Sequence, residues 1–373
     1  MDIARTVTAD SGEAEGPPGG NLTFDKRRAL LTVGLSLVLA GGAYALIGRV
    51  AHWGDLLDGL RRANRAWFPV LLLGEIFAYA GYVLAYRDVA RVHGGPQLRY
   101  WTIIRVVAIG FGAFAVGSSA GSLAVDFWAL RRAGVRTHQA VRRVLALNTL
   151  EWAWLAGFAA ISGAIALGLR QAHAPLAMCI AWLVVVPACV LAAVWVSAPA
   201  RGERLATSPE VGRGAGSRSR AARAAHWLLD KGRAAFAEAV GGLLIVRRIL
   251  GNPLRYPAGF VGYPVYWTGD LLTLYAAARA FGYHVAPDLL ILAYATGYVI
   301  TAIPLPAGGA GGVDATLTFT LHLAGLPLAV SLLSVAVYRI FSFWLPIVPA
   351  IAFLPTVGAV QNDLRETAEA HSP

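Results

Sequence analysis

Seven ionisable side chains lie within apolar stretches of this sequence that are long enough to enter a membrane: Glu75, Arg105, Asp126, Glu151, Asp270, Asp314 and Arg339. An ionised group at membrane depth costs several kcal/mol unless it is paired or hydrated, so such residues are by default candidates for a functional site. Two chemistries fit these residue types. They bind the polar part of a substrate, or they form Arg–carboxylate pairs that hold neighbouring helices together.

Asp314 stands near the end of an unusual stretch, "PLPAGGAGGVDA", which separates two apolar runs. Its glycines are Gly308, Gly309, Gly311 and Gly312. Glycine adopts positive φ readily and lets another group come close to the backbone. A helix that begins near Gly312 would present free N–H groups and a positive dipole end to an anionic group. The alternatives are that Asp314 caps this helix and that the glycines allow close contact between helices.

This stretch has a partner earlier in the chain, "GSSAGSLAVD", which also ends in Val-Asp. Gly121 matches Gly309 and Asp126 matches Asp314, both at an offset of 188 residues. The same offset relates Gly74 to Gly262, Gly81 to Gly269, Arg91 to Arg279 and Gly94 to Gly282. Candidate polar contacts within the first stretch are Ser118 and Ser119. The register indicates a duplication of the membrane part of the chain.

Composition assigns the chain to the helical membrane proteins. Its mean hydropathy is +0.57, 57% of its residues are hydrophobic and 14% are charged. Several apolar runs reach the roughly 20 residues that a helix needs to cross a bilayer. The candidate spans are residues 29–47, 67–86, 100–117, 144–168, 175–197, 257–278, 287–305 and 328–354. The 11 Trp and 13 Tyr suit a protein with two membrane–water interfaces.

The segments that follow the two glycine-rich stretches, 121–131 and 312–325, are too short to cross a bilayer. We therefore predict two re-entrant hairpins, 100–131 and 287–325, about six full spans, and both termini inside. Most arginine clusters then lie on one side, as the positive-inside rule requires, with the cluster at 49–65 as an exception. The second copy would be inverted relative to the first. The expected fold class is an all-α polytopic membrane protein with an inverted repeat.

The sequence divides into five expected segments. They are a disordered cytoplasmic tail at 1–28, a first membrane repeat at 29–197, a basic cytoplasmic loop at 198–255, a second membrane repeat at 256–358 and a C-terminal tail at 359–373. The loop holds eleven Lys and Arg against four Asp and Glu. Its apolar residues at helical spacing are Trp227, Phe236, Val240, Leu243 and Leu244. This pattern favours an amphipathic helix on anionic lipid over a contact with nucleic acid.

Motifs for catalysis or cofactor binding do not occur in the sequence. The histidines lack metal-ligand spacing, and there is no Ser-His-Asp set, GxSxG or GKS pattern. Cys179 and Cys189 belong to one expected helix and would be about 15 Å apart, too far for a disulfide within it. We therefore expect no metal, no cofactor and no enzymatic activity.

The C-terminal part of the chain carries several motifs that occur together in one family. They are the glycine-rich stretch with Asp314 and Ala315, the turn Gly325–Leu326–Pro327, and the pair Tyr338–Arg339. On these residues the chain resembles the lysylphosphatidylglycerol synthetase transmembrane (flippase-like) domain family, over roughly residues 30–358. Two positions depart from the family pattern. Asp314 replaces the usual Glu, and Thr149, which aligns with Arg339, replaces an Arg of the first copy.

The resemblance implies a flippase-like protein of the inner (plasma) membrane rather than a synthase, because little chain follows the last expected span to form a soluble aminoacyl-transfer domain. It would translocate a lipid or lipid-linked precursor whose anionic headgroup binds at the glycine-rich helix breaks. The expected site residues are Asp314, Arg339, Tyr338, Gly308, Gly309, Gly311, Gly312, Asp126, Arg105, Ser118, Ser119, Gly121, Asp270, Glu75 and Glu151.

Two other functions remain open. The chain could be a non-transporting accessory subunit that presents lipid to a partner enzyme, or a membrane enzyme that acts on polyprenyl phosphates. The absence of a metal-binding cluster of Asp and Glu in the sequence disfavours the enzyme. The expected partners are membrane lipids, anionic ones above all, and a second copy of the chain or a lipid-modifying enzyme. Nucleic acid is not an expected partner.

Overall fold

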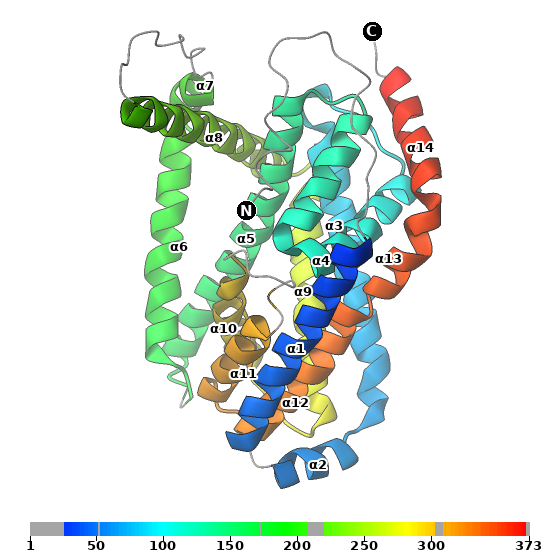
Figure 1. The fold of residues 1–373 in the computed structure, drawn as a ribbon. Coiled ribbons are helices and arrows are strands. Elements are labelled where there is room, and N and C mark those ends of the chain that lie inside the picture. Colours follow the sequence, from blue (N-terminus) through cyan, green and yellow to red (C-terminus); the bar gives the residue numbers. More distant parts are fainter. Residues whose placement is uncertain are drawn as a thin grey trace.

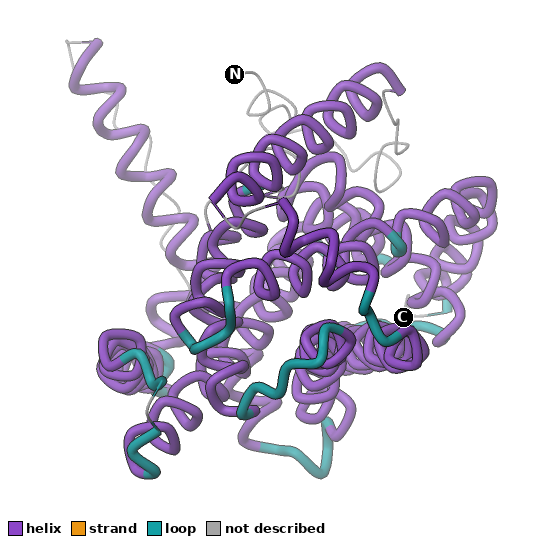
Figure 2. The backbone as a smooth tube through the Cα atoms, turned by 90° about the horizontal axis from the view of Figure 1, so that it is seen from below, coloured by secondary structure: helices purple, strands orange, loops and turns teal. Residues whose placement is uncertain are grey.

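The chain is a bundle of helices wherever the structure describes it (Figures 1 and 2). A computed structural model describes residues 26–50, 53–171, 173–206, 220–302, 309 and 311–370. The helices are α1 (Lys26–Val50), α2 (Trp53–Arg61), α3 (Phe68–Arg91), α4 (Tyr100–Arg132), α5 (Thr137–Gly168), α6 (Leu176–Val196), α7 (Pro199–Ala206), α8 (Arg220–Gly251), α9 (Pro257–Ala280), α10 (Pro287–Tyr298), α11 (Gly312–Leu323), α12 (Leu328–Arg339), α13 (Ile347–Phe353) and α14 (Val357–Glu369). The all-helical fold class predicted from the sequence is confirmed for these residues.

The most extensive helix pair is formed by α3 and α9. Their backbones approach closely through glycines. A Cβ added to Gly74 would lie 2.7 Å from the carbonyl oxygen of Gly269, and one added to Gly262 would lie 2.7 Å from that of Gly81. The partner's number falls as the residue number rises, so the two helices are antiparallel. Small residues at such contacts are typical of helix pairs within membranes.

The helix α4 folds back on itself. A Cβ added to Gly121 would overlap the carbonyl group of Ala113, and one added to Gly110 would lie 3.6 Å from Ser122 Oγ. Residues eight positions apart in a straight helix are separated by about 12 Å along its axis. The chain therefore reverses between Ala113 and Gly121, and the two arms of α4 pack against each other as a helical hairpin. The sequence predicts a hairpin at this place.

A second hairpin is formed by α10 and α11. The end of α10 continues into a short 3-10 turn, Val299–Ala302, and α11 begins at Gly312. The arms touch at Gly297, where an added Cβ would lie 2.9 Å from the Cα atom of Leu317. Thr316 Oγ1 also donates a hydrogen bond to the Gly297 carbonyl at 2.8 Å. In Figure 1 this hairpin lies in the lower half of the bundle and α4 in the upper half.

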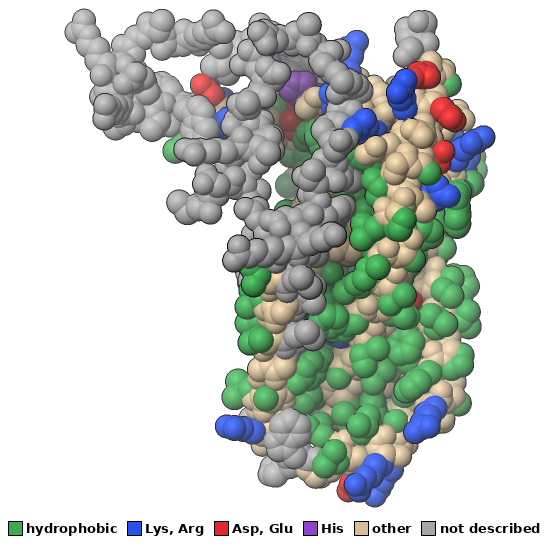
Figure 3. Space-filling model, turned by 45° about the vertical axis from the view of Figure 1, so that its right-hand side comes forward, with side chains coloured by type: hydrophobic (Ala, Val, Ile, Leu, Met, Phe, Trp, Pro, Cys, Tyr) green, Lys and Arg blue, Asp and Glu red, His purple; other side chains and the backbone are tan. Residues whose placement is uncertain are grey.

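Four stretches of the described chain are long and apolar enough to cross a membrane. They are Arg65–Gly94, Thr137–Gly168, Leu176–Val196 and Leu328–Glu369, and shorter apolar helices cover Tyr100–Ala115 and Pro287–Ala302. Helices α1 and α9 have 25 and 24 residues, enough length to cross as well, so six full spans remain a prediction. Figure 3 shows hydrophobic side chains over the middle of one face and Lys and Arg towards its two ends. The protein is a multi-pass membrane protein.

Two of the segments expected to lie outside the membrane, the basic loop and the C-terminal tail, are helical where the structure describes them, whereas residues 1–25 of the expected N-terminal tail lie outside the described residues. The basic loop forms α7 and α8, and α8 lies across one end of the bundle against α5 (Figure 1). There Arg142 Nε lies 2.9 Å from Glu238 Oε2. The expected C-terminal tail is α14, which packs on α4 with Val360 and Leu364 fully buried. Its apolar residues are too few for a span, which is why the sequence suggests only a tail.

Candidate functional site

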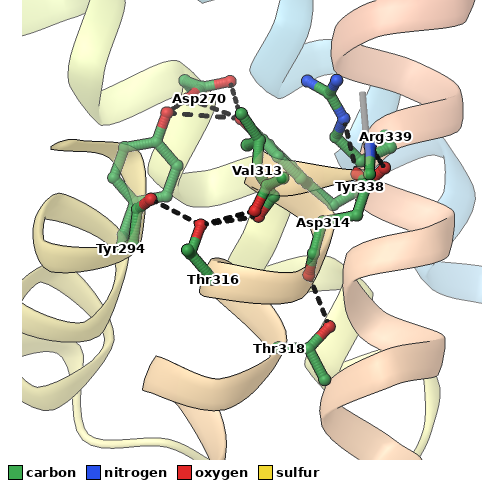
Figure 4. A network of polar contacts seen from close by, with 11 residues as sticks. Asp270, Tyr294, Val313, Asp314, Thr316, Thr318, Tyr338 and Arg339 are labelled. Atoms are coloured by element: carbon green, nitrogen blue, oxygen red, sulfur yellow. Dashed lines mark hydrogen bonds and ion pairs between the residues drawn. The ribbon is translucent and has the colours of Figure 1, made fainter. Parts of the chain in front are cut away.

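Asp314 and Arg339 form a buried ion pair between α11 and α12 (Figure 4). Arg339 Nε lies 2.9 Å from Asp314 Oδ1, and the two residues are 7% and 2% exposed. Arg339 is the last residue of α12 and is followed directly by a π-helical segment, Ile340–Trp344. Such segments are frequent at functional sites. The pair has the geometry of the structural Arg–carboxylate alternative, and it holds α11 against α12.

Asp314 also caps its own helix. Its Oδ2 accepts a hydrogen bond from the backbone N–H of Gly311 at 2.9 Å, and Thr318 Oγ1 donates to its backbone carbonyl at 2.7 Å. One carboxylate therefore satisfies a free N–H at the start of α11 and neutralises Arg339 at the same time. This double role fixes the direction in which α11 leaves the helix break.

Glycine is required at the second helix break for two reasons. Gly309 and Gly311 have φ angles of 74° and 81°, which other residues adopt only with strain. In addition, a Cβ on Gly311 would lie 2.7 Å from the carbonyl oxygen of Leu39, because α1 passes close to this point. Gly312 begins α11. Gly308 lies outside the described residues. The glycines thus serve both backbone conformation and close helix contact.

Asp270 is the centre of a second polar group, contributed by three helices (Figure 4). The hydroxyl of Tyr338 on α12 lies 3.0 and 3.1 Å from its two carboxylate oxygens, and the hydroxyl of Tyr294 on α10 also donates to it. All three residues are buried. Two phenol donors stabilise the ionised carboxylate, so Asp270 is well supplied with partners although it has no direct ion pair among the described residues.

A cavity of about 110 Å³ lies beside these groups, large enough for several water molecules. Its wall is built by α3, α4, α5, α9, α10, α12 and neighbouring segments, and thus by helices before and after the basic loop. Ionisable and hydroxyl groups on the wall include Glu75, Glu151, Asp270, Tyr338, Arg339 and Ser342. The structure therefore brings five of the expected site residues to one cavity, and Asp314 lies directly behind Arg339.

Four polar atoms of cavity-lining residues have no hydrogen-bond partner within the described part of the chain. They are Glu75 Oε1, Tyr79 Oη, Arg339 Nη2 and Ser342 Oγ. Buried polar atoms are bonded in the great majority of cases. The residues that carry these atoms line the cavity, and the four atoms include an acceptor and a cationic donor.

The first hairpin carries its acid in a different setting. Tyr82 Oη donates to Asp126 Oδ2 at 2.9 Å, and Tyr86 Oη donates to the Asp126 backbone carbonyl at 3.3 Å. Asp126 is 1% exposed and forms no ion pair with a described residue. Thr149, the position aligned with Arg339, bonds to the Leu145 carbonyl of its own helix at 2.8 Å. Among the described residues, Asp126 therefore lacks the cation that Asp314 has.

Some expected site residues lie away from the cavity. Arg105 Nη1 lies 3.9 Å from Asp363 Oδ2 on α14, and its guanidinium is 5.2 Å from the centre of the Trp101 ring. Gly121 lies where the arms of α4 touch, so its small size serves that contact. The side chains of Ser118 and Ser119 lie outside the described residues. Arg105 is separated from the site because α14 packs on the first arm of α4.

Sequence reasoning identified Tyr338 but missed the other tyrosines of the site. Tyr82, Tyr294 and Tyr298 lie within apolar helices, where the sequence offers no sign that a hydroxyl faces a carboxylate or a cavity. The sequence feature that could have identified them is their position in the middle of an apolar span, since tyrosines of membrane proteins concentrate at the two membrane–water interfaces. In the described part of the chain no group of three or more His, Cys, Asp or Glu could hold a metal ion.

Comparison with known proteins gives one finding about the family. A search of curated proteins gave no match. The family model described as "Lysylphosphatidylglycerol synthase TM region" matches residues 31–350, which include both hairpins and the whole wall of the cavity. The chain therefore belongs to the lysylphosphatidylglycerol synthase transmembrane-region family.

Proposed function

We propose that this protein translocates a phospholipid or a lipid-linked precursor across the cell (inner) membrane. The observation that carries the proposal is the cavity, which lies among helices of both copies and has ionisable groups on its wall. Ionisable side chains within membranes face such cavities and mark substrate pathways. In transporters with repeated halves, the substrate site lies between the halves near the middle of the bilayer.

The glycine contacts support an inverted repeat, which this proposal requires. The sequence equates Gly74 with Gly262 and Gly81 with Gly269, whereas in space Gly74 touches Gly269 and Gly81 touches Gly262. A two-fold axis between the two helices produces this exchange of partners. The two copies would then face opposite sides of the membrane.

The hairpins support the same arrangement. They lie in opposite halves of the bundle in Figure 1, as expected if each enters the membrane from its own side. Gly94 and Gly282, matched by the repeat, follow α3 and α9 and have positive φ angles of 71° and 81°. A cavity between two such hairpins can be exposed to either side in turn.

The charges on the wall favour a headgroup that carries both a phosphate and an amine. Asp314 engages Arg339 Nε, which leaves Nη2 for a phosphate oxygen. The three carboxylates on the wall, Glu75, Glu151 and Asp270, suit an ammonium group. The family name refers to lysylphosphatidylglycerol, a lipid with both groups. The sequence analysis expects an anionic headgroup, and we propose that the anionic part of this headgroup is its phosphate.

The end of the molecule that carries α8 is proposed to face the cytoplasm. Leu228, Leu229 and Phe236 of α8 are exposed apolar side chains, and Arg247 and Arg248 are exposed basic ones. A helix with this composition lies well in the interface of a membrane that contains anionic lipid. This orientation also agrees with the positive-inside rule.

The test is reconstitution of the purified protein into vesicles that contain a fluorescent phospholipid with an amine-bearing headgroup or one without the amine. A membrane-impermeant quencher reports how fast lipid leaves the inner leaflet. We expect the amine-bearing lipid to equilibrate faster than in protein-free vesicles. Arg339→Lys keeps a charge beside Asp314 but removes the planar fork, so it should slow translocation while the protein stays folded. Arg365→Lys, at an exposed arginine of α14, is the matched control.

Two outcomes would contradict the proposal. Equilibration no faster than in protein-free vesicles would exclude translocation by this chain alone, and binding of lipid without movement would favour the accessory-subunit alternative. Equal loss of translocation in Arg339→Lys and Arg365→Lys would show that the guanidinium of Arg339 does not bind the headgroup.

A further inference from the structure

The wall of the cavity carries more carboxylic acids than basic side chains. Arg339 is the basic residue among the described residues of the wall, and Asp314 already pairs with it. Glu75, Glu151 and Asp270 on the wall are left without a cation of their own. Neighbouring carboxylates removed from water cannot all be ionised, so one or more of them must bind a proton or a cation.

Glu75 and Asp270 are direct neighbours across the contact between α3 and α9. The preceding residues, Gly74 and Gly269, touch backbone to backbone, and both acids reach the same cavity. Asp270 receives two phenol hydrogen bonds, which stabilise its ionised form. Glu75 is 5% exposed, and its Oε1 has no hydrogen-bond partner among the described residues. Of the two, Glu75 is therefore the one that gains from holding a proton.

We propose that Glu75 is the proton-binding site of this protein, and that its proton is exchanged for the amine of the lipid headgroup at the Glu75–Asp270 pair. This coupling rests on the proposed translocation. A headgroup ammonium that enters the cavity brings one positive charge next to the pair. The proton then leaves Glu75 for water on the open side, and the charge beside Asp270 stays balanced. After the lipid leaves, a proton returns to Glu75.

The groups that face Glu75 come from every helix packed around it. On the cavity wall they are Tyr79 and Tyr82 on α3, Glu151 on α5, Asp270 on α9, Tyr298 on α10, and Tyr338 and Arg339 on α12. Behind the wall lie Tyr294, bonded to Asp270, and Asp126, bonded to Tyr82. Because the tyrosines are neutral donors and Arg339 belongs to Asp314, the sum of their charges is negative. This field favours a proton on Glu75 rather than an ionised carboxylate.

A spectroscopic experiment tests the proton site without any lipid substrate. The purified protein in lipid nanodiscs is examined by infrared spectroscopy for the C=O stretch of protonated carboxyl groups at neutral pH. We expect such a band in the wild type, a shift of the band after isotope labelling of glutamate, and its loss in Glu75→Gln. Glu366→Gln, at an exposed glutamate of α14, should leave the band unchanged. Absence of the band in the wild type, or an undiminished band in Glu75→Gln, would overturn the proposal.

A further variant decides the question if Glu75→Gln does not fold. Glu151→Gln removes the other glutamate of the wall. Persistence of the glutamate band in this variant assigns the proton to Glu75, whereas its loss would assign the proton to Glu151 and overturn the proposal.

The coupling is tested in vesicles with an imposed pH gradient. We expect translocation of the amine-bearing lipid to rise several-fold when the gradient drives protons against the direction of lipid movement, and this dependence to vanish in Glu75→Gln. Translocation that ignores the gradient would overturn the exchange while leaving the translocation itself intact. Failure of all translocation would remove the proposed function, and the infrared band would still decide whether Glu75 holds a proton.

Discussion

The two hairpins carry an aspartate at matching positions and surround it with opposite chemistry. Asp314 in the second hairpin faces the guanidinium of Arg339 at 2.9 Å. Asp126 in the first hairpin faces the neutral hydroxyl of Tyr82 at 2.9 Å. Both aspartates are almost fully buried. The difference lies in the partner: the charge of Asp314 is compensated by a guanidinium, and Asp126 accepts a hydrogen bond from a neutral phenol.

The comparison extends to other positions that the internal sequence match equates. The position that supplies the cation in the second copy is Thr149 in the first, and the position that supplies the phenol in the first copy is Asp270 in the second. The charged groups of the cavity wall are Glu75 on α3, Glu151 on α5, Asp270 on α9 and Arg339 on α12, so the cation of the wall stands on α12. We infer that the headgroup binds in one orientation, with its phosphate towards Arg339.

The largest effect is expected from Arg339→Leu. It leaves Asp314 as an uncompensated buried carboxylate, which should lower the free energy of unfolding by about 3–5 kcal/mol. The double variant Arg339→Leu with Asp314→Leu should recover most of that loss, because neither charge remains, yet it should not translocate lipid. Thermal unfolding and the vesicle assay measure the two properties. Wild-type translocation in the double variant would show that Arg339 serves only the fold.

The same substitution at the two aspartates tests whether the two hairpins differ in the partner of the carboxylate. Asp314→Asn leaves Arg339 buried without a counter-charge and should destabilise the protein by about 3–5 kcal/mol. Asp126→Asn keeps an acceptor for the Tyr82 hydroxyl, so its cost should stay within the roughly 1 kcal/mol of one neutral hydrogen bond. Thermal unfolding of both variants in the same detergent gives the difference. Equal destabilisation would mean that Asp126 has a cationic partner after all.

The next effect concerns the glycines of the second helix break. Gly311→Ala places a side chain at a φ of 81° and against the Leu39 carbonyl, so it should cost about 1–3 kcal/mol from strain alone. Gly157→Ala is the control, since a Cβ there meets nothing within 4 Å in α5. The control should be neutral or stabilise by up to about 1 kcal/mol. Equal thermal stability of the two variants would show that neither the φ angle of Gly311 nor its contact with α1 requires glycine at this position.

The smallest effect comes from restoring the missing cation. Thr149→Arg should bring a guanidinium towards Asp126, as Arg339 lies beside Asp314. A double-mutant cycle with Asp126→Asn, measured by thermal unfolding, should give a favourable coupling of about 0.5–3 kcal/mol. Additive effects would mean that Thr149 and Arg339 do not occupy equivalent places in the two copies.

Periodicity and residue type predict the fold class, because an apolar run of membrane length satisfies its backbone polar groups in a bilayer by forming a helix. They also identify most of the ionisable residues of the cavity, since charge at depth is conspicuous in a sequence. Asp314 is an instructive case. Its place just after a glycine break predicts helix capping, whereas the sequence leaves open whether Asp314 or Asp270 pairs with Arg339.

Other parts of the site could not be predicted, because they depend on which helices become neighbours. Arg105 has the same membrane-depth signature as Arg339, but α14 places Asp363 beside it. Tyr294 beside Asp270 and Tyr82 beside Asp126 resemble ordinary aromatic residues of apolar helices until two distant helices meet. The role of Gly121 is also visible only once the arms of α4 pack together.

The central claim is that lipid headgroups pass through the cavity beside Arg339, and blocking that cavity tests it most directly. Ser342 lies on the wall, and its hydroxyl has no hydrogen-bond partner among the described residues. Replacing it by cysteine therefore breaks no such bond and places a thiol on the wall. Ser342→Cys is introduced together with Cys179→Ala and Cys189→Ala, and lipid translocation is measured before and after modification by a bulky thiol reagent. Ala164→Cys, at an exposed position of α5, is the control in the same background. The account predicts that modification stops translocation in the Ser342→Cys protein and leaves the control unaffected. Undiminished translocation after complete modification of the Ser342→Cys thiol would contradict it.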